Sequence, residues 1–191
     1  MDEPQATSAR LHLLLIAIVF FAPLLVAAWL YYGGYFAGSA ERTNNGALLE
    51  PIVNLGDALP GSGLHASGDG RWLLLYADTG ACGADCRNAL YTTRQSRQML
   101  GQEMHRVARV FLHGATAPDT VFLAAEHQGL ITITDASLNR LLDNKRPAAL
   151  PAGGYYLIDP LGNLVMYFQP DLDPSDMVED IEHLLKLSRI G

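Results

Sequence analysis

An uncharged apolar run from Leu11 to Leu30 constrains this chain more than any other stretch of its sequence. A transmembrane helix needs about 20 apolar residues, because the hydrocarbon core of a bilayer is about 30 Å thick and each helical residue advances about 1.5 Å. In lipid the backbone polar groups must pair within the segment, which a helix allows and an isolated strand does not. Aromatic residues follow where a membrane interface is expected: Trp29, Tyr31, Tyr32 and Tyr35. We predict a membrane anchor over residues 11–32.

A cleaved signal peptide is the alternative for this run. Its basic start would be poor, because Asp2 and Glu3 oppose Arg10. The run also exceeds the roughly 7–15 apolar residues of a signal core, although the small residues at 37–40 offer a cleavage position. We favour a retained anchor, with residues 1–10 in the cytoplasm and the rest of the chain outside, because a closely spaced cysteine pair fits an oxidising compartment.

Composition divides the rest of the chain into a linker and one folded domain. Residues 33–46 are small and polar, as in a flexible tether, and we place the domain at 47–191. The formal net charge of the chain is −7 at pH 7, and no basic patch of the size that nucleic acid requires is present. We therefore expect no nucleic-acid partner.

From Arg71 onward the sequence alternates between strand and helix patterns. The apolar run at 71–77 is typical of a strand covered on both faces. The order predicts an α/β fold of the thioredoxin-like type, a central mixed sheet flanked by helices. The further expected elements are a helix over 86–105, a strand over 107–114, a helix over 118–129, a strand-like segment at 130–134, a helix over 135–144, a hairpin over 153–169 and a last helix that Asp173 and Pro174 open.

Cys82 and Cys86 are the only cysteines, and both follow the first predicted strand directly. If a helix begins near 83–85, the two thiols share one helix face at its N-terminus, which favours the thiolate form. Their Cα atoms would then lie about 6 Å apart, within disulfide range. The spacing permits a reversible disulfide and equally a two-thiolate Cu(I) site. A purely structural disulfide is the weaker alternative, because so short a loop gains little stability from closure.

His113 is the candidate third ligand among the histidines. It ends the second predicted strand, and sites in open α/β sheets gather at the C-terminal ends of the strands. The strand before Cys82 ends at the same edge, so His113 is placed near the thiols. A partly exposed histidine without a functional role explains the position equally well.

Three segments resemble the SCO/SenC family. They are GRWLLLYADTGACGADC at 70–86, VARVFLHGATAPDT at 107–120 and YYLIDPLGNLVMYF at 155–168, and the similarity extends in order from Gly70 to Leu185. The resemblance implies a thioredoxin-like domain behind a single inner-membrane anchor, on the periplasmic side. It also implies a role in assembling cytochrome c oxidase, with an oxidase subunit or other assembly factors as partners. Members deliver copper to the oxidase or keep the cysteines of its copper centre reduced.

The sequence departs from the family pattern at two places. Arg87 stands where the family usually has proline, and the stretch 149–156 lacks the family's copper-binding histidine. The family ligands carry over as Cys82 and Cys86 only, unless His113 substitutes for the missing one. This shifts the expectation from copper carriage towards thiol reduction, or towards a divergent assembly factor with an altered site. Pro151 is a candidate for the cis proline that thioredoxin-like proteins place beside their cysteines.

Two alternative functions stay open from the sequence. Thr79 stands three residues before Cys82, as in the Thr-x-x-Cys pattern of peroxiredoxins, although the supporting proline is absent. A non-catalytic docking module of a respiratory complex is the other alternative, which the missing histidine favours. A fold alone does not decide among these functions.

Overall fold

The computed structural model describes residues 5–33, 44–59, 64, 68–188 and 190. The chain forms two compact units, one up to Thr43 and one from Asn44 onward, and each is described by itself. Most of the predicted linker lies outside the described residues.

The first unit contains one long helix, α1 (Gln5–Tyr32). It begins six residues before the apolar run, and Pro23 lies inside it. Its segment Leu11–Leu30 has a mean hydropathy of 2.8, and none of that segment is buried within the protein. Within the described part of the chain this is one helix long and apolar enough to cross a membrane, a property that a signal sequence shares.

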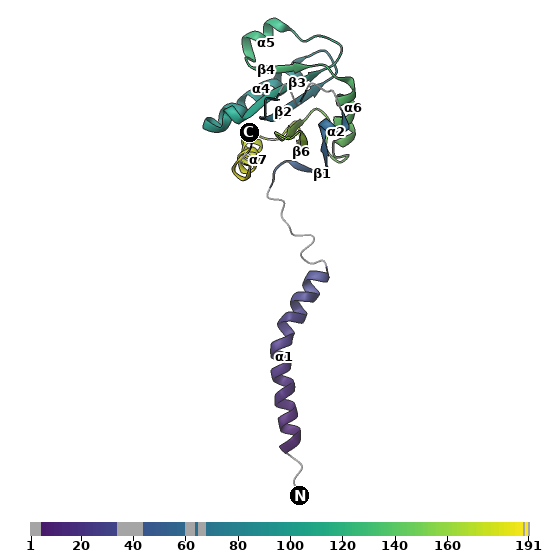
Figure 1. Cartoon of the computed structure of the whole chain (residues 1–191), viewed down its shortest axis with the longest axis vertical. Helices are drawn as coiled ribbons and strands as arrows, with labels where there is room; N and C mark the ends of the chain where they lie inside the picture. The colour runs from purple at the N-terminus through teal and green to yellow at the C-terminus, as the bar shows by residue number, and fades with distance from the viewer. Residues whose placement is uncertain (1–4, 34–43, 60–63, 65–67, 189, 191) are drawn as a thin grey trace. The chain divides into compact units, whose positions relative to one another are not determined.

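The second unit is built on a six-stranded mixed sheet in the order β1-β6-β5-β2-β3-β4 (Figure 1). β2, β3 and β4 pair in parallel, whereas β5 runs antiparallel to β2, and β6 and β1 continue as antiparallel neighbours. This mixed sheet confirms the predicted fold class. The strands are β1 (Ala47–Asn54), β2 (Trp72–Asp78), β3 (Val107–His113), β4 (Leu130–Ile133), β5 (Tyr155–Ile158) and β6 (Asn163–Phe168).

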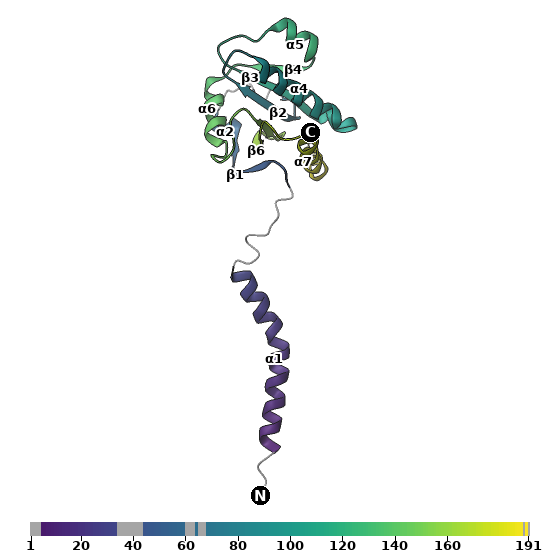
Figure 2. The ribbon, with the colours of Figure 1, turned by 180° about the vertical axis from the view of Figure 1, so that it is seen from behind.

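Helices cover both faces of the sheet, as the ribbon shows from two sides (Figures 1 and 2). α4 (Ala84–Met99) and α7 (Pro174–Leu187) pack on one face, and α2 (Leu55–Ala58) and α6 (Ala136–Lys145) pack on the other. α5 (Thr120–Glu126) connects β3 to β4. The strands divide their side chains between two apolar clusters by simple alternation, so Leu74 faces α4 and Leu75 faces α6.

Three local differences separate the structure from the sequence prediction. The helix expected over 86–105 is α4 followed by a 3-10 turn, η1 (Gly101–Arg106), because Gly101 adopts a φ of 56° that ends the α-helix. The edge strand β1 was not predicted. The helix expected to reach Gly129 ends at Glu126, and Gly129 instead forms the turn into β4 with a φ of 73°.

Side-chain caps begin most of the domain's helices. Asn54, Asp119, Asp135 and Asp173 each accept hydrogen bonds from backbone N–H groups in the first turn of α2, α5, α6 and α7. The predicted caps Asp119 and Asp173 are thereby confirmed. α4 differs, because its N-cap is Gly83 and no side chain caps its first turn.

Candidate functional site

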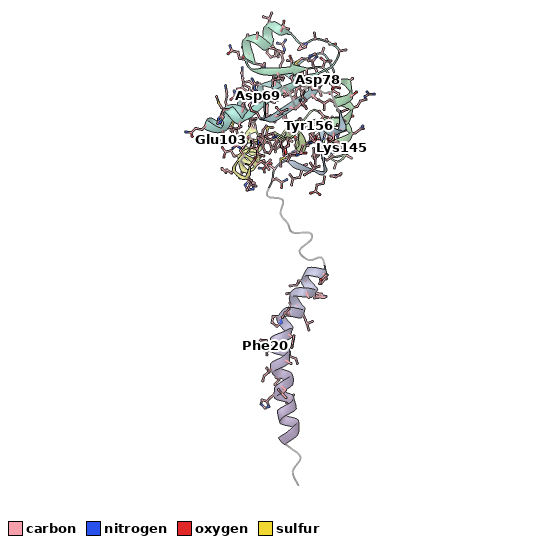
Figure 3. The ribbon with its side chains drawn as sticks, viewed as in Figure 1. Phe20, Asp69, Asp78, Glu103, Lys145 and Tyr156 are labelled. Carbon is pink, nitrogen blue, oxygen red and sulfur yellow. A yellow bond between two sulfur atoms is a disulfide. The ribbon has the colours of Figure 1, made fainter. Side chains whose placement is uncertain are left out.

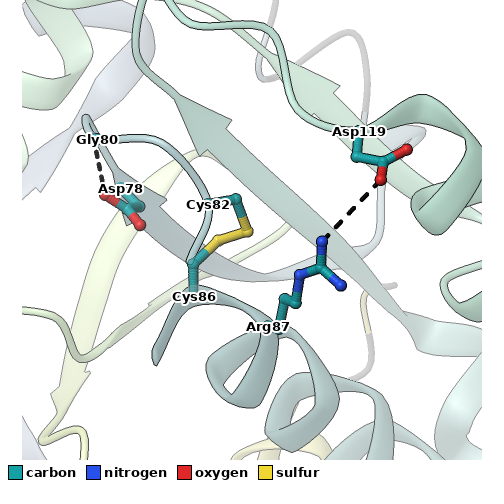
Figure 4. Close-up of a disulfide and its surroundings, with 6 residues drawn as sticks. All are labelled: Asp78, Gly80, Cys82, Cys86, Arg87 and Asp119. Carbon is teal, nitrogen blue, oxygen red and sulfur yellow. Dashed lines mark hydrogen bonds and ion pairs between the residues drawn. A yellow bond between two sulfur atoms is a disulfide. The ribbon is translucent and has the colours of Figure 1, made fainter. Parts of the chain in front are cut away.

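Cys82 and Cys86 form a disulfide at the N-terminus of α4 (Figure 4). Cys82 lies in the loop after β2, and Cys86 lies in the first turn of the helix. Their Cα atoms are 5.0 Å apart, within the range that disulfides span. The local geometry follows from the sequence, because the apolar strand ends at Asp78 and Gly83 starts the helix.

The two sulfurs differ in their access to solvent. Cys86 is 1% exposed and belongs to the apolar cluster under α4, whereas Cys82 is half-buried and packs at the margin of that cluster. An incoming thiolate or disulfide therefore reaches Cys82 more readily than Cys86. In an exchange reaction this asymmetry would favour Cys82 as the attacking thiol and Cys86 as the resolving thiol.

The bare N-terminus of α4 provides the positive potential of the site. The first turn of a helix leaves backbone N–H groups without intrahelical partners, and they carry a partial positive charge. With glycine at the N-cap, no side-chain oxygen occupies these groups. They remain available to a thiolate at Cys82 or Cys86, which lowers the free energy of that ionised form.

Asp78 shapes the loop that leads to the cysteines. Its carboxylate accepts a hydrogen bond from the Gly80 N–H at 2.8 Å (Figure 4). Tyr76 lies two residues earlier on the same face of β2, where burial and then the charge of Asp78 raise the pKa of its phenol. The Tyr76 hydroxyl is therefore uncharged near neutral pH. Tyr76 is not among the site residues predicted from the sequence, although its alternation with Asp78 along the strand places both on one face.

Arg87 directs its charge towards α5. Its guanidinium lies 4.0 Å from the Asp119 carboxylate (Figure 4) and, in addition, 4.5 Å from the centre of the Phe122 ring. Phe122 in turn packs at the margin of the cluster that contains Cys86. The residue that replaces the family's proline thus ties the cysteine-bearing helix to the start of α5.

His113 lies at the end of β3, in register with Asp78 of β2. Its ring centre is 5.8 Å from that of Phe111, which belongs to the same apolar cluster as Cys86. Its ring nitrogens contact the Thr134 hydroxyl at 3.0 and 3.2 Å and the Gly114 carbonyl at 2.8 Å. His113 and the disulfide therefore share one face of the sheet.

The loop after His113 packs on the loop before Cys82. The Gly114 N–H donates to the Asp78 carbonyl at 3.0 Å, and a Cβ at Gly114 would collide with the backbone of Thr79. Glycine is required at this crossing for that reason.

No group of three or more histidine, cysteine, aspartate or glutamate residues that could hold a metal ion occurs in the described part of the chain. The assignment of His113 as a copper ligand stays a prediction.

A cavity of about 450 Å³ opens beside the start of the cysteine loop. Residues 76–79, 152–154 and part of α6 line it, and two of its lining residues, Asp78 and Tyr156, are labelled in Figure 3. On its 152–154 side, the Tyr167 hydroxyl accepts from the Gly154 N–H at 3.0 Å and donates to the Pro151 carbonyl at 2.6 Å.

The cis proline expected at Pro151 is absent. The described residues contain one cis peptide bond, and it joins Glu50 to Pro51 in β1. Gly153 and Gly154 follow Pro151 and form the final approach to β5. A Cβ at Gly154 would collide with the Phe168 carbonyl and the Tyr167 hydroxyl, so backbone rather than a side chain fills this position.

Comparisons with known proteins agree on the fold. A search of curated proteins finds no match. Apo Sco1 from Thermus thermophilus matches with a TM-score of 0.54 and 14% identity, covering 76% of this chain and 99% of that chain. Yeast Sco1 with copper bound matches with a TM-score of 0.51 and 17% identity, covering 65% of this chain and 81% of that chain. A second structure of yeast Sco1 gives a TM-score of 0.52 at 17% identity, covering 65% and 85%.

A family model covers most of the folded domain. The model of the transmembrane-like, thioredoxin-like C-terminal domain matches residues 72–188, from the first residue of β2 to the end of α7. The matched region includes the disulfide, His113 and the loop before β5. The structural matches to Sco proteins show that the sheet and helices are also arranged as in a thioredoxin-like fold. Sco proteins are among its structural neighbours, and the chain belongs to the family of transmembrane-like, thioredoxin-like C-terminal domains.

Proposed function

We propose that this protein is a membrane-anchored thiol–disulfide reductant that acts in the assembly of cytochrome c oxidase. The observation that carries the proposal is the disulfide between a half-buried Cys82 and a buried Cys86 at an uncapped helix N-terminus. The anchor is α1, and we place the domain on the periplasmic side of the inner membrane. The client we propose is a disulfide in the copper-binding subunit of the oxidase.

The reaction proceeds through a mixed disulfide. In the dithiol form, the Cys82 thiolate attacks one sulfur of the client disulfide, which bonds Cys82 to the client and releases the other client sulfur as a thiolate. The Cys86 thiolate then attacks the Cys82 sulfur and releases the second client thiolate. The client gains two electrons, and the protein is left as the Cys82–Cys86 disulfide described here. A separate dithiol donor must reduce this bond before the next cycle.

Copper carriage is the second candidate, because His113 lies on the same sheet face as the cysteines. Two thiolates and one imidazole would suit Cu(I), which prefers soft sulfur ligands. In this arrangement Cu(I) is cargo that passes to the client. The Thr134 hydroxyl and Gly114 carbonyl now hold the imidazole, so it must leave these contacts to bind the metal.

Thiol exchange separates these functions most directly. The reduced full chain in non-ionic micelles is mixed with a synthetic peptide closed by one disulfide, and opened peptide is measured over time. We expect wild type to open the peptide, Cys82→Ser to be inactive, and Cys86→Ser to accumulate the mixed disulfide without turnover. Ala84→Ser, an exposed change in the same helical turn, serves as the matched control and retains the activity. Full turnover by Cys86→Ser would contradict the two-cysteine mechanism.

A Cu(I) competition titration on the same samples tests the copper candidate. Tight one-to-one binding that is lost in Cys82→Ser, Cys86→Ser and His113→Ala would establish the carrier. If wild type does not bind Cu(I) tightly, copper carriage is excluded and thiol reduction is left as the proposed function. If neither exchange nor copper binding occurs, but the chain still co-purifies with an oxidase subunit after loss of both cysteines, the protein is a docking module. Rapid consumption of hydrogen peroxide by the reduced chain would instead indicate a peroxidase.

A further inference from the structure

Arg109 is a buried cation in the middle of β3. Only 4% of it is exposed, and its neighbours along the strand are apolar core residues. Its guanidinium donates to the Gln128 carbonyl at 3.1 Å and lies 3.5 Å from Nδ1 of His127. Within the described part of the chain, no carboxylate lies within ion-pair distance of it. Burial of an uncompensated charge is unfavourable, so the fold maintains this cation against an electrostatic cost.

Two further arginines converge on the same place from α4. Arg94, Arg97 and Arg109 line a cavity of about 220 Å³, which we call the arginine cavity. Arg97 donates to the Val107 carbonyl at 2.6 Å and, like Arg109, has no carboxylate partner among the described residues. The remaining lining residues are Gln98, Ala125, Glu126 and Gln128. Glu126 is the single acid of this lining, and it pairs with Arg94 at 3.1 Å.

His127 contacts Arg109 but does not line the cavity, and its imidazole supplies no counter-charge to the arginines. Burial, then the charges of Arg109 and Arg94, lower the pKa of its imidazole. Burial, then the charges of Arg97 and Arg94, lower the pKa of Arg109 to about 10, so its guanidinium stays protonated near neutral pH. Three cations thus face one carboxylate in a protein whose formal net charge is −7. The sign of the local charge is opposite to that of the whole chain.

We propose that the arginine cavity binds an oxyanion of the phosphate class. A guanidinium presents paired N–H donors that match two oxygens of one phosphate, and Arg97 and Arg109 both lack a carboxylate competitor. The exposed Gln98 amide at the rim provides one more donor. The volume exceeds that of a bare phosphate and accommodates an ester substituent. A soluble phosphate ester and the phosphate headgroup of a lipid share this chemistry. The proposal is independent of the thiol function.

Titration with inorganic phosphate tests the cavity in the full chain, held in non-ionic micelles. Binding is measured by calorimetry at constant ionic strength, with chloride replaced by phosphate. We expect saturable one-to-one binding by wild type and a dissociation constant raised about tenfold or more by Arg97→Gln, because a charged hydrogen-bond donor is lost. Lys186→Gln removes an exposed positive charge from α7, outside the cavity, and should leave the binding unchanged.

Glu126→Gln keeps the test decisive if the arginine variants fold poorly. Removing the single carboxylate of the lining leaves Arg94 without its charged partner, although Arg94 still donates to the backbone carbonyl of residue 126, so the dissociation constant for phosphate should fall about threefold. Near-ultraviolet circular dichroism verifies that each variant is folded. No saturable phosphate binding by wild type would overturn the proposal, and so would equal affinities for Glu126→Gln and wild type.

Lipid discs identify the source of the oxyanion once binding is observed. The full chain is inserted in discs of phosphatidylcholine alone or with phosphatidic acid, and the phosphate titration is repeated. Competition by phosphatidic acid that disappears in Arg97→Gln would identify a lipid headgroup as the ligand. Unchanged phosphate binding in both discs would identify a soluble phosphate or phosphate ester. Both results support an oxyanion site in the arginine cavity.

Discussion

His127 is a buried imidazole between an aromatic ring and a cation. Its ring lies edge-on to Phe122 at 5.0 Å, and Arg109 approaches its Nδ1. Because its pKa is lowered in the folded state, the unfolded chain binds the proton first as the pH falls below about 6.5. The contribution of His127 to the free energy of unfolding is therefore greatest above that pH and decreases below it. We predict that His127→Gln flattens the pH dependence of stability between pH 7 and pH 5.

Urea unfolding of the full chain in micelles, at a series of pH values, measures this dependence. His183 on α7 is exposed, so His183→Gln should leave the slope of stability against pH as it is in wild type. A slope in His127→Gln equal to that of wild type would show that another group causes the acid sensitivity.

Residues of the site could be predicted where the groups that interact are close together in the sequence. The cysteine spacing placed the two thiols within disulfide range but permitted a two-thiolate Cu(I) site equally, and the structure shows Cys82 in the loop before α4 and Cys86 in its first turn. The arginine cavity was not predictable, because Arg94 and Arg109 come from different elements and converge only in the folded chain. The available signal was a charged residue, Arg109, inside an otherwise apolar strand.

At the scale of elements, α4 is the one α-helix of the described domain with an assigned N-cap that lacks a side-chain cap. Gly83 has a φ of −83°, and a Cβ there would meet nothing closer than ordinary contact, so a side chain fits. We predict that Gly83→Asp caps α4 and raises the pKa of the Cys82 thiol. The new carboxylate would occupy the free N–H groups and repel the thiolate. Alkylation of the reduced chain by iodoacetamide against pH measures that pKa.

Gly83→Asn separates the two causes of this shift. Asparagine caps the same N–H groups without a negative charge, so its effect on the thiol pKa should be smaller than that of aspartate. Thiol exchange with the disulfide peptide should slow in the order wild type, Gly83→Asn, Gly83→Asp at pH 7. An unchanged thiol pKa in Gly83→Asp would show that the helix N-terminus does not activate Cys82.

Element prediction succeeded where one face or both faces of a segment are buried. β2, β3, the β5–β6 hairpin and α7 followed from continuous or periodic apolar residues and their caps. β1 was missed because its pattern is weak: Leu48 and Ile52 are exposed, Pro51 interrupts it, and its pairing with β6 lies more than a hundred residues away. Such an edge strand depends on tertiary contacts rather than on local sequence.

At the scale of the whole molecule, Asp180 of α7 ties the first residues of the domain to its last helix. It is 5% exposed, and its carboxylate accepts from the backbone N–H groups of Gly46 at 2.7 Å and Asn45 at 3.1 Å. We predict that Asp180→Ala lowers the free energy of unfolding by about 2–4 kcal/mol, because two charge-assisted hydrogen bonds are lost and buried N–H groups remain unpaired. Urea unfolding measures the loss.

Glu179→Ala, an exposed acidic change one residue earlier, is the control for this stability effect and should cost well under 1 kcal/mol. Limited proteolysis adds a positional measurement, because loosening of the Asn45–Gly46 segment should expose cleavage sites before β1. If Asp180→Ala and Glu179→Ala unfold at the same urea concentration, the Asp180 carboxylate does not hold this segment in solution.

The crowded backbone at Gly154 limits where a histidine could stand in the loop before β5, the place where the resemblance to the SCO/SenC family leads one to expect it. A single substitution at Gly154 meets the Phe168 carbonyl, and Gly153 has a φ of 85°, which disfavours any side chain. Two successive positions before β5 are therefore closed to imidazole by backbone geometry alone. A single substitution to histidine at Gly153 or Gly154 would therefore strain the backbone or collide with it. A designer who wants a copper site here must remodel β6 first or place the ligand elsewhere in the fold.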